Sequence, residues 1–134
     1  MVELDKTAMD FVEEAEPETE LLDVEAVDAE RERGETLLVD IRDVRELWRE
    51  GTIPDAEHVP RGMLEFWADP ESEYYRDFFD PDKRIVLFCN KASRSALAAK
   101  RLQELGYPNV AHLDGGFTAW DEAGKSVDDV EPRE

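Results

Sequence analysis

The centre of the chain reads RIVLFCNKASRSALAA over residues 84–99. The apolar run at 85–88 is typical of a strand that is covered on both faces of a parallel sheet. Residues 95–105 have the pattern of a helix, which Gly106 would end. Between the two lie Cys89 and a short polar loop. The stretch therefore predicts a strand, a loop and a helix, with Cys89 at the strand's carboxyl end, where open α/β sheets bind ligands.

Further strand-like and helix-like segments alternate on both sides of this centre. Strands are expected at residues 36–41, 57–59 and 109–113. Helices are expected after Asp23 and Asp43, which are suited to cap them, and at residues 117–120, where Trp120 would pack against the sheet. This alternation predicts an α/β fold with a mainly parallel sheet and helices on both faces.

The remaining segments are less regular. The segment 61–80 mixes aromatic residues with acids, and we expect two short core-packed helices that are interrupted near Pro70. We interpret residues 1–20 as an acidic, partly helical N-terminal extension, 21–125 as one domain and 126–134 as an acidic C-terminal tail.

The composition is strongly acidic. With 35 acidic and 16 basic residues, the formal net charge is -19 at pH 7. Such a surface repels nucleic acid phosphates and anionic membranes, so neither is an expected partner. The acidity, with arginine more frequent than lysine, agrees equally with a surface adapted to concentrated salt and with an ordinary acidic surface plus a loose tail.

Cysteine and histidine are scarce. Cys89 is the only cysteine, and His58 and His112 are the only histidines. A disulfide within the chain is excluded, and too few ligands remain for a transition metal, so we expect no metal and no cofactor. The chain has no run of roughly 18 apolar residues and no signal-peptide pattern at its start, which favours a cytoplasmic protein with a reduced thiol.

Cys89 is the candidate nucleophile. A free cysteine more often packs as a small buried hydrophobe. Here, however, it follows the apolar run and precedes Asn90 and Lys91, residue types that are rarely buried unless paired. A helix amino terminus and the cations Lys91 and Arg94 would stabilise a thiolate, the reactive form of cysteine. The position therefore favours a catalytic role.

Four stretches of the chain resemble the rhodanese family of sulfurtransferases over roughly residues 20–125. They read LVDIR at 38–42, GTIPDA and HVP at 51–56 and 58–60, CNKASRSALAA at 89–99, and LDGGFTAW at 113–120. All four occur in the family's order and at its separations. The resemblance implies a five-stranded, mainly parallel sheet flanked by helices on both faces.

The resemblance also implies a reaction. Cys89 would take a sulfane sulfur from thiosulfate or a similar donor, hold it as a persulfide, and pass it to a thiol, to cyanide or to a protein acceptor. Backbone N–H groups of the active-site loop would stabilise the persulfide anion. That loop comprises Asn90, Lys91, Ala92, Ser93, Arg94 and Ser95.

Two positions depart from the family pattern. Ala92 stands where the family often has glycine, so a left-handed backbone at this position would cost about 1 kcal/mol and lower the activity. Thr52 stands where histidine is common, at a position to which we assign a structural role.

Four residues outside the loop are expected to support the structure. Asp40 and Arg42 would order the neighbouring loop through a salt bridge rather than take part in catalysis. We interpret His58 and His112 as structural or surface residues, because neither is near the cysteine in sequence, and we expect no Cys-His dyad.

Two other functions stay open at this point. Cysteine phosphatases and arsenate reductases of related fold use a C-x5-R loop, whereas Cys89 to Arg94 is C-x4-R, a shorter ring that suits a sulfur atom better than a phosphate. The other alternative is a catalytically weak rhodanese-like module for binding or sensing. The nucleophile set between two cations favours the transferase over such a module.

Overall fold

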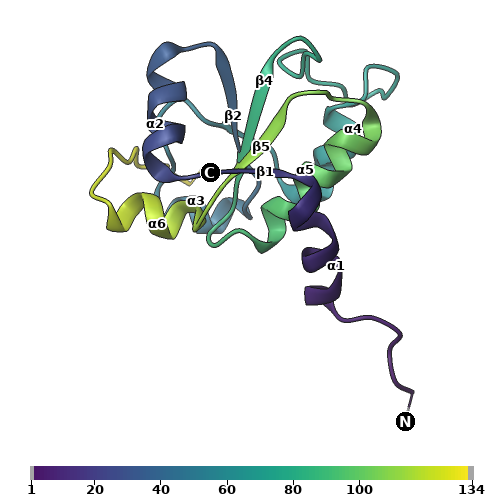
Figure 1. The fold of residues 1–134 in the computed structure, drawn as a ribbon. Helices are drawn as coiled ribbons and strands as arrows, with labels where there is room; N and C mark the ends of the chain where they lie inside the picture. Colours follow the sequence, from purple (N-terminus) through teal and green to yellow (C-terminus); the bar gives the residue numbers. More distant parts are fainter. Residues whose placement is uncertain (1, 133–134) are drawn as a thin grey trace.

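A computed structural model describes residues 2–132 and contains a five-stranded parallel sheet (Figure 1). Its strands are β1 (Glu20–Leu22), β2 (Thr36–Asp40), β3 (Glu57–His58), β4 (Arg84–Phe88) and β5 (Val110–Leu113). They lie in the order β1-β5-β4-β2-β3, and all neighbours are parallel. The predicted α/β class is confirmed, and the central strand β4 carries Cys89 at its carboxyl end.

Helices cover both faces of the sheet. The α-helices are α1 (Ala8–Ala15), α2 (Val24–Arg33), α3 (Val44–Glu50), α4 (Leu64–Trp67), α5 (Ser93–Leu105) and α6 (Gly116–Glu122). In Figure 1, α2 and α6 lie on one side of the sheet and α4 and α5 on the other. The side chains of Asp23 and Asp43 cap α2 and α3 as expected, each accepting a backbone N–H from the first turn. No helix in the described part of the chain is long and apolar enough to cross a membrane.

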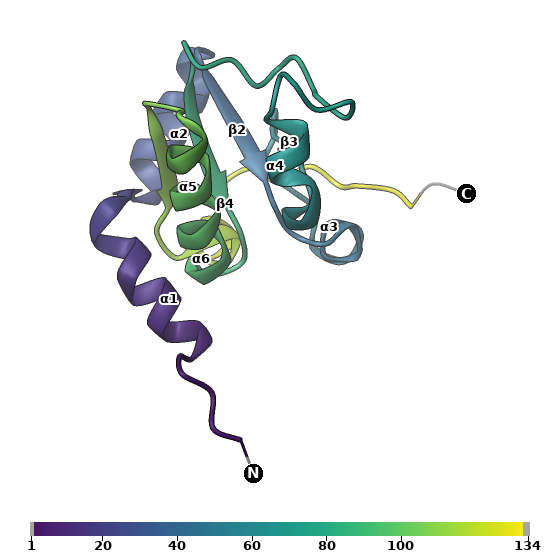
Figure 2. The ribbon, with the colours of Figure 1, turned by 90° about the vertical axis from the view of Figure 1, so that its right-hand side faces the viewer.

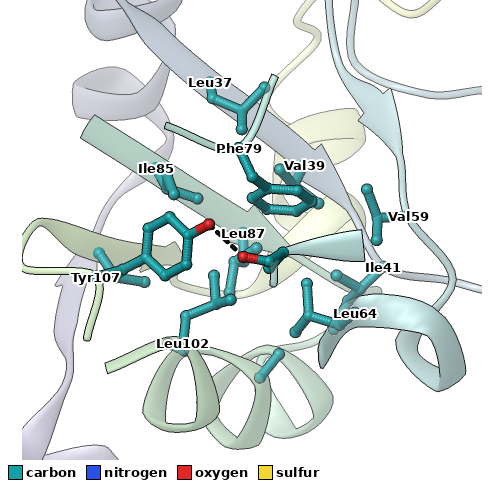
Figure 3. Packing of buried hydrophobic residues seen from close by; sticks show 14 of the residues in the cluster. Leu37, Val39, Ile41, Val59, Leu64, Phe79, Ile85, Leu87, Leu102 and Tyr107 are labelled. Carbon is teal, nitrogen blue, oxygen red and sulfur yellow. Dashed lines mark hydrogen bonds between the residues drawn. The ribbon is translucent and has the colours of Figure 1, made fainter. Parts of the chain in front are cut away.

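Alternate residues of the central strands fill two hydrophobic cores. Figure 3 shows the core beneath α4 and α5, where Val39 and Leu87 from the sheet meet Leu102 of α5. In the same view, the Tyr107 hydroxyl donates a hydrogen bond to the carbonyl oxygen of Ala68 at 2.5 Å. The core on the other face includes the fully buried Trp120, which packs α6 against the sheet as predicted.

Of the two helices predicted within residues 61–80, only the first forms. It consists of the 3-10 helix η2 (Arg61–Met63) and α4, and turns follow as far as β4. Asp69 and Ser72 accept hydrogen bonds from backbone N–H groups two residues further on, a local alternative to helical bonding. The aromatics also divide: Phe79 is buried, but Phe66 and Tyr74 stay half-exposed and stack edge to face.

Much of the acidic segment 1–20 packs against the domain. Val12 and Ala15 of α1 are buried against Ala96 of α5. The 3-10 helix η1 (Glu16–Glu18) then leads into β1, an edge strand that the sequence analysis did not predict and that pairs with β5. Residues before α1 extend away from the sheet (Figure 2).

The start of the predicted tail also returns to the domain. The backbone of Asp128 forms an antiparallel bridge with Thr52. The indole N–H of Trp120 donates to the carbonyl oxygen of Ser126 at 2.7 Å. Residues 133–134 lie outside the described part of the chain.

Candidate active site

Cys89 lies where the loops after β2, β4 and β5 meet, because parallel strands place their carboxyl ends at one edge of the sheet. The first N–H groups of α6 hold this loop: Phe117 N donates to the carbonyl oxygen of Cys89 at 2.7 Å, and Thr118 N to that of Asn90 at 3.1 Å. Gly116 permits this approach, since its φ is +58° and a Cβ there would overlap the Cys89 carbonyl oxygen. Gly116 therefore allows the start of α6 to hold the loop that contains Cys89.

The cysteine itself is buried, with 1% of its surface exposed. Its Sγ lies 3.6 Å from the hydroxyl oxygen of Ser95, in the first turn of α5. Within the described structure, no backbone N–H group of residues 90–95 donates a hydrogen bond to a protein acceptor. Unpaired N–H groups of this kind, in a loop that leads into a helix, are suited to bind an anion.

Ala92 is not strained. Its φ of -175° is extended rather than left-handed, so the penalty considered for a missing glycine does not arise. Helix α5 begins at Ser93, two residues earlier than predicted, which places Ser95 inside the helix and close to the thiol.

The cation at the end of the loop is paired with a carboxylate. Arg94 donates two hydrogen bonds to Glu46 of α3, at 2.9 and 3.0 Å. These bonds hold the pKa of the Glu46 carboxyl below its ordinary value and raise the pKa of Arg94. Asn90 Nδ2 donates to Glu46 at 2.8 Å and to Glu50 at 3.3 Å. By contrast, Lys91 is exposed and forms no ion pair with any residue in the range 2–132.

Sequence reasoning missed both of these glutamates. They are four residues apart and so share one face of α3, which is a visible signal in the sequence. Nothing in that signal, however, indicates that the face is turned toward the loop of β4.

Asp40 and Arg42 form the predicted salt bridge, at 2.8 Å, and both side chains are fully buried. Arg42 also donates to Asn90 Oδ1 at 3.2 Å and to the carbonyl oxygen of Gly51 at 2.7 Å. Thr52 donates to Asp40 at 2.8 Å. The guanidinium therefore joins β2, the segment after α3 and the loop that follows Cys89.

The two histidines differ. His58 Nε2 lies 2.7 Å from the carbonyl oxygen of Arg42, and that ring contributes to the support of the loop. His112, in β5, is buried, and its Nδ1 lies 2.9 Å from the Ser95 hydroxyl oxygen. Burial lowers the pKa of His112 despite the opposing charge of Asp114.

His112 is therefore not a surface residue, and Ser95 links it to Cys89. Sequence distance hid this arrangement, because β5 is the parallel neighbour of β4 in the sheet. The residues in the range 2–132 include no group of three or more side chains suited to hold a metal ion.

Comparisons with known proteins assign the family. The sequence pattern of the rhodanese-like domain matches residues 23–123. The chain belongs to the rhodanese-like domain family. A sulfurtransferase of Allochromatium vinosum is 33% identical over 86 residues, which are 64% of this chain and 72% of that protein. This domain spans 48% of the length of one curated relative and 19% of another.

Solved structures agree with the assignment. A protein of unknown function from Rhodopseudomonas palustris, described as a possible tyrosine phosphatase, is 40% identical with a TM-score of 0.91, over 96% of this rhodanese-like chain and 98% of that one. The polysulfide-sulfur transferase homodimer of Wolinella succinogenes is 31% identical with a TM-score of 0.71, over 89% and 85%. Sulfurtransferases are thus among the relatives of this rhodanese-like chain.

Proposed function

We propose that this rhodanese-like domain transfers a sulfane sulfur from thiosulfate or a similar donor to a thiophilic acceptor through a persulfide on Cys89. The observation that carries the proposal is the placement of this thiol at the amino end of α5, beside a loop whose backbone N–H groups lack protein acceptors. Such a loop stabilises a sulfur anion without a metal.

In the first half-reaction, the Cys89 thiolate attacks the outer sulfur of thiosulfate. The bond between the two sulfur atoms of thiosulfate breaks, and its electron pair leaves with sulfite. A persulfide anion stays on the enzyme. The N–H groups of residues 90–95 stabilise that anion. In the second half-reaction, a thiolate or cyanide attacks the outer sulfur, and the Cys89 thiolate leaves.

The charges around the loop influence which donors bind. Lys91 is available to attract an anionic donor, whereas Glu46 occupies the guanidinium of Arg94. A polysulfide is a second candidate donor, because the Wolinella relative is a polysulfide-sulfur transferase. The acceptor is a small thiol, cyanide or a protein thiol in the cytoplasm, and the net charge of -19 disfavours nucleic acid and membrane partners.

Mass spectrometry of the intact protein tests the proposal. Reduced protein is incubated with thiosulfate or polysulfide, and we expect a gain of one sulfur atom on Cys89, followed by thiocyanate release when cyanide is added. Cys89→Ser should show neither, while Ser72→Ala, which changes a hydroxyl in the turns after α4, should show both. If the wild-type thiol stays unmodified with every donor, the domain is a binding or sensing module instead.

A phosphatase assay tests the remaining alternative. The relative from Rhodopseudomonas palustris is described as a possible tyrosine phosphatase. In this chain the C-x4-R ring is shorter, and the Arg94 guanidinium already donates two hydrogen bonds to Glu46, so it is not free to bind a phosphate bidentately. Hydrolysis of an aryl phosphate by the wild type, lost in Cys89→Ser, would favour the phosphatase.

A further inference from the structure

A chain of hydrogen-bonding side chains leads from the nucleophile to the surface. Cys89 Sγ lies 3.6 Å from Ser95 Oγ, which lies 2.9 Å from His112 Nδ1. The other ring nitrogen, Nε2, lies 3.2 Å from the hydroxyl oxygen of Thr19. The first three residues are buried, whereas Thr19, just before β1, is half-buried. This series of side chains thus connects α5, β5 and the segment that follows α1.

Only a few hydrogen-bond arrangements are possible among these side chains, because each carries a fixed number of protons. Each hydroxyl has one proton, and a neutral imidazole has one N–H and one acceptor nitrogen. The imidazole of His112 is neutral near pH 7, because its burial lowers its pKa. Leu21 and Leu87 are its neighbours on the adjacent strands, and Asp114 is the charged group that acts on it, from the end of β5.

In the thiol state, the bonds run from the sulfur outward. The Cys89 S–H donates to Ser95 Oγ, Ser95 donates to His112 Nδ1, and Nε2–H donates to Thr19. The Thr19 hydroxyl then donates to the carbonyl oxygen of Glu16 at 3.2 Å. Every donor has an acceptor in this arrangement.

In the thiolate state, the hydrogen bonds between the same atoms run in the opposite direction. Thr19 donates to Nε2, Nδ1–H donates to Ser95 Oγ, and the Ser95 hydroxyl donates to the sulfur anion. A hydrogen bond donated to the charged form of an acid stabilises that form. The carbonyl oxygen of Ala92, 3.1 Å from Ser95 Oγ, is a competing acceptor for this hydroxyl and belongs to neither arrangement.

We propose that Ser95, His112 and Thr19 form a proton relay that reverses direction when Cys89 ionises. The thiol proton passes to Ser95, the Ser95 proton passes to Nδ1, the Nε2 proton passes to Thr19, and the Thr19 proton leaves to water. The net change is one thiol converted to one thiolate and one proton in solution. The relay rests on the Cys89 chemistry proposed above, in which Sγ is anionic before attack and again when the acceptor takes the sulfur.

The tautomer of His112 tests the relay directly. The ¹⁵N chemical shifts of the imidazole distinguish the nitrogen that carries the proton, and alkylation by iodoacetamide locates the pH at which Cys89 ionises. We expect Nε2–H below that pH and Nδ1–H above it. In Cys89→Ser, whose hydroxyl stays neutral, the tautomer should not change. One tautomer throughout in the wild type would overturn the relay.

Variants extend the test to each link. Ser95→Ala should raise the pH midpoint of alkylation by about one unit, which is roughly tenfold slower alkylation below the midpoint. His112→Phe should also raise the pH midpoint. The double variant should match Ser95→Ala alone, because both substitutions interrupt the same relay. Additive shifts would contradict a single relay.

Thr19→Val keeps the test decisive if the buried variants fail to fold, because this position is half-buried. Its midpoint should rise by less than that of Ser95→Ala, and an unchanged midpoint overturns the outer half of the relay. Thr36→Val is the matched control, since that hydroxyl donates to Glu30 of α2 from the amino end of β2 and contacts no member of the relay. None of these measurements needs a sulfur donor. A protein that shows the tautomer change but forms no persulfide therefore contradicts the proposed function and not the relay.

Discussion

At the scale of single residues, Glu46 partly neutralises the positive charge of the loop that follows Cys89. Its carboxylate binds the guanidinium of Arg94 through two hydrogen bonds, and this pair is partly exposed. Glu46→Gln should release part of that charge to an anionic donor. Because exposed ion pairs contribute about 0.2–1 kcal/mol, we expect the KM for thiosulfate in persulfide formation to fall up to about fivefold.

The control for this prediction is Glu104→Gln. That glutamate lies at the other end of α5, where it pairs with Arg101. It should leave the KM unchanged. A higher KM for Glu46→Gln would mean that the glutamate acts mainly by holding the loop in shape.

The buried pair of Asp40 and Arg42 leads to a second prediction at this scale. Removing one partner of a buried ion pair leaves an uncompensated charge, which typically destabilises a protein by 3–5 kcal/mol. Arg42→Met should therefore lower the free energy of unfolding by about 3 kcal/mol or more in urea denaturation. Asp40→Leu combined with Arg42→Met should recover part of that loss, and a double variant less stable than Arg42→Met would contradict the assignment.

At the scale of elements, α1 is an integral part of the fold. Val12 is 2% exposed and faces Ala96 near the start of α5. Val12→Asp would place a charge in this contact, so we expect α1 to detach and its amides to exchange rapidly with deuterium while those of β4 stay protected. Glu13→Ala, on the exposed side of the same helix, should keep the wild-type pattern. Equal protection of α1 in both variants would show that the contact is not needed.

The elements also show which parts of the structure the sequence could predict. The strand 84–88 and the helix after it were predictable, because a continuous apolar run and a helical period are local signals. β1 was not, since two of its three residues are exposed at the sheet edge, and the segment gains strand structure only by pairing with β5. The link between His112 and Ser95 was hidden for a related reason: it depends on which strands are neighbours, and strand order is not a local property.

At the scale of the whole molecule, His112 predicts how stability depends on pH. Burial holds its folded pKa below the ordinary value of 6.5, whereas the unfolded chain has the ordinary value. Below pH 6.5 the unfolded state therefore binds a proton that the folded state does not, and stability falls until the folded pKa is passed. The pKa of the Glu46 carboxyl is lowered from 4.5, so its protonation reduces stability only at a lower pH than that of His112.

Urea denaturation at about pH 7.5 and about pH 5.5 isolates this effect. We expect the wild type to be less stable at the lower pH and His112→Phe to lose most of that difference. His58→Gln should retain it. An equal decrease in wild type and His112→Phe would assign the pH dependence to other groups.

The net charge of -19 predicts the response of the whole molecule to salt. Repulsion among like charges acts over about 10 Å at 0.1 M ionic strength but only about 3 Å at 1 M. Exposed ion pairs weaken over the same range but contribute little, and the buried pair of Asp40 and Arg42 is hardly screened. NaCl should therefore raise the urea concentration at which half of the protein is unfolded, the urea midpoint.

A variant with Glu13, Glu32 and Glu122 replaced by glutamine should respond less to NaCl, because these glutamates are exposed and form no ion pair with a described residue. If salt lowered the midpoint instead, surface ion pairs would outweigh the repulsion, and adaptation to concentrated salt would no longer explain the acidic surface.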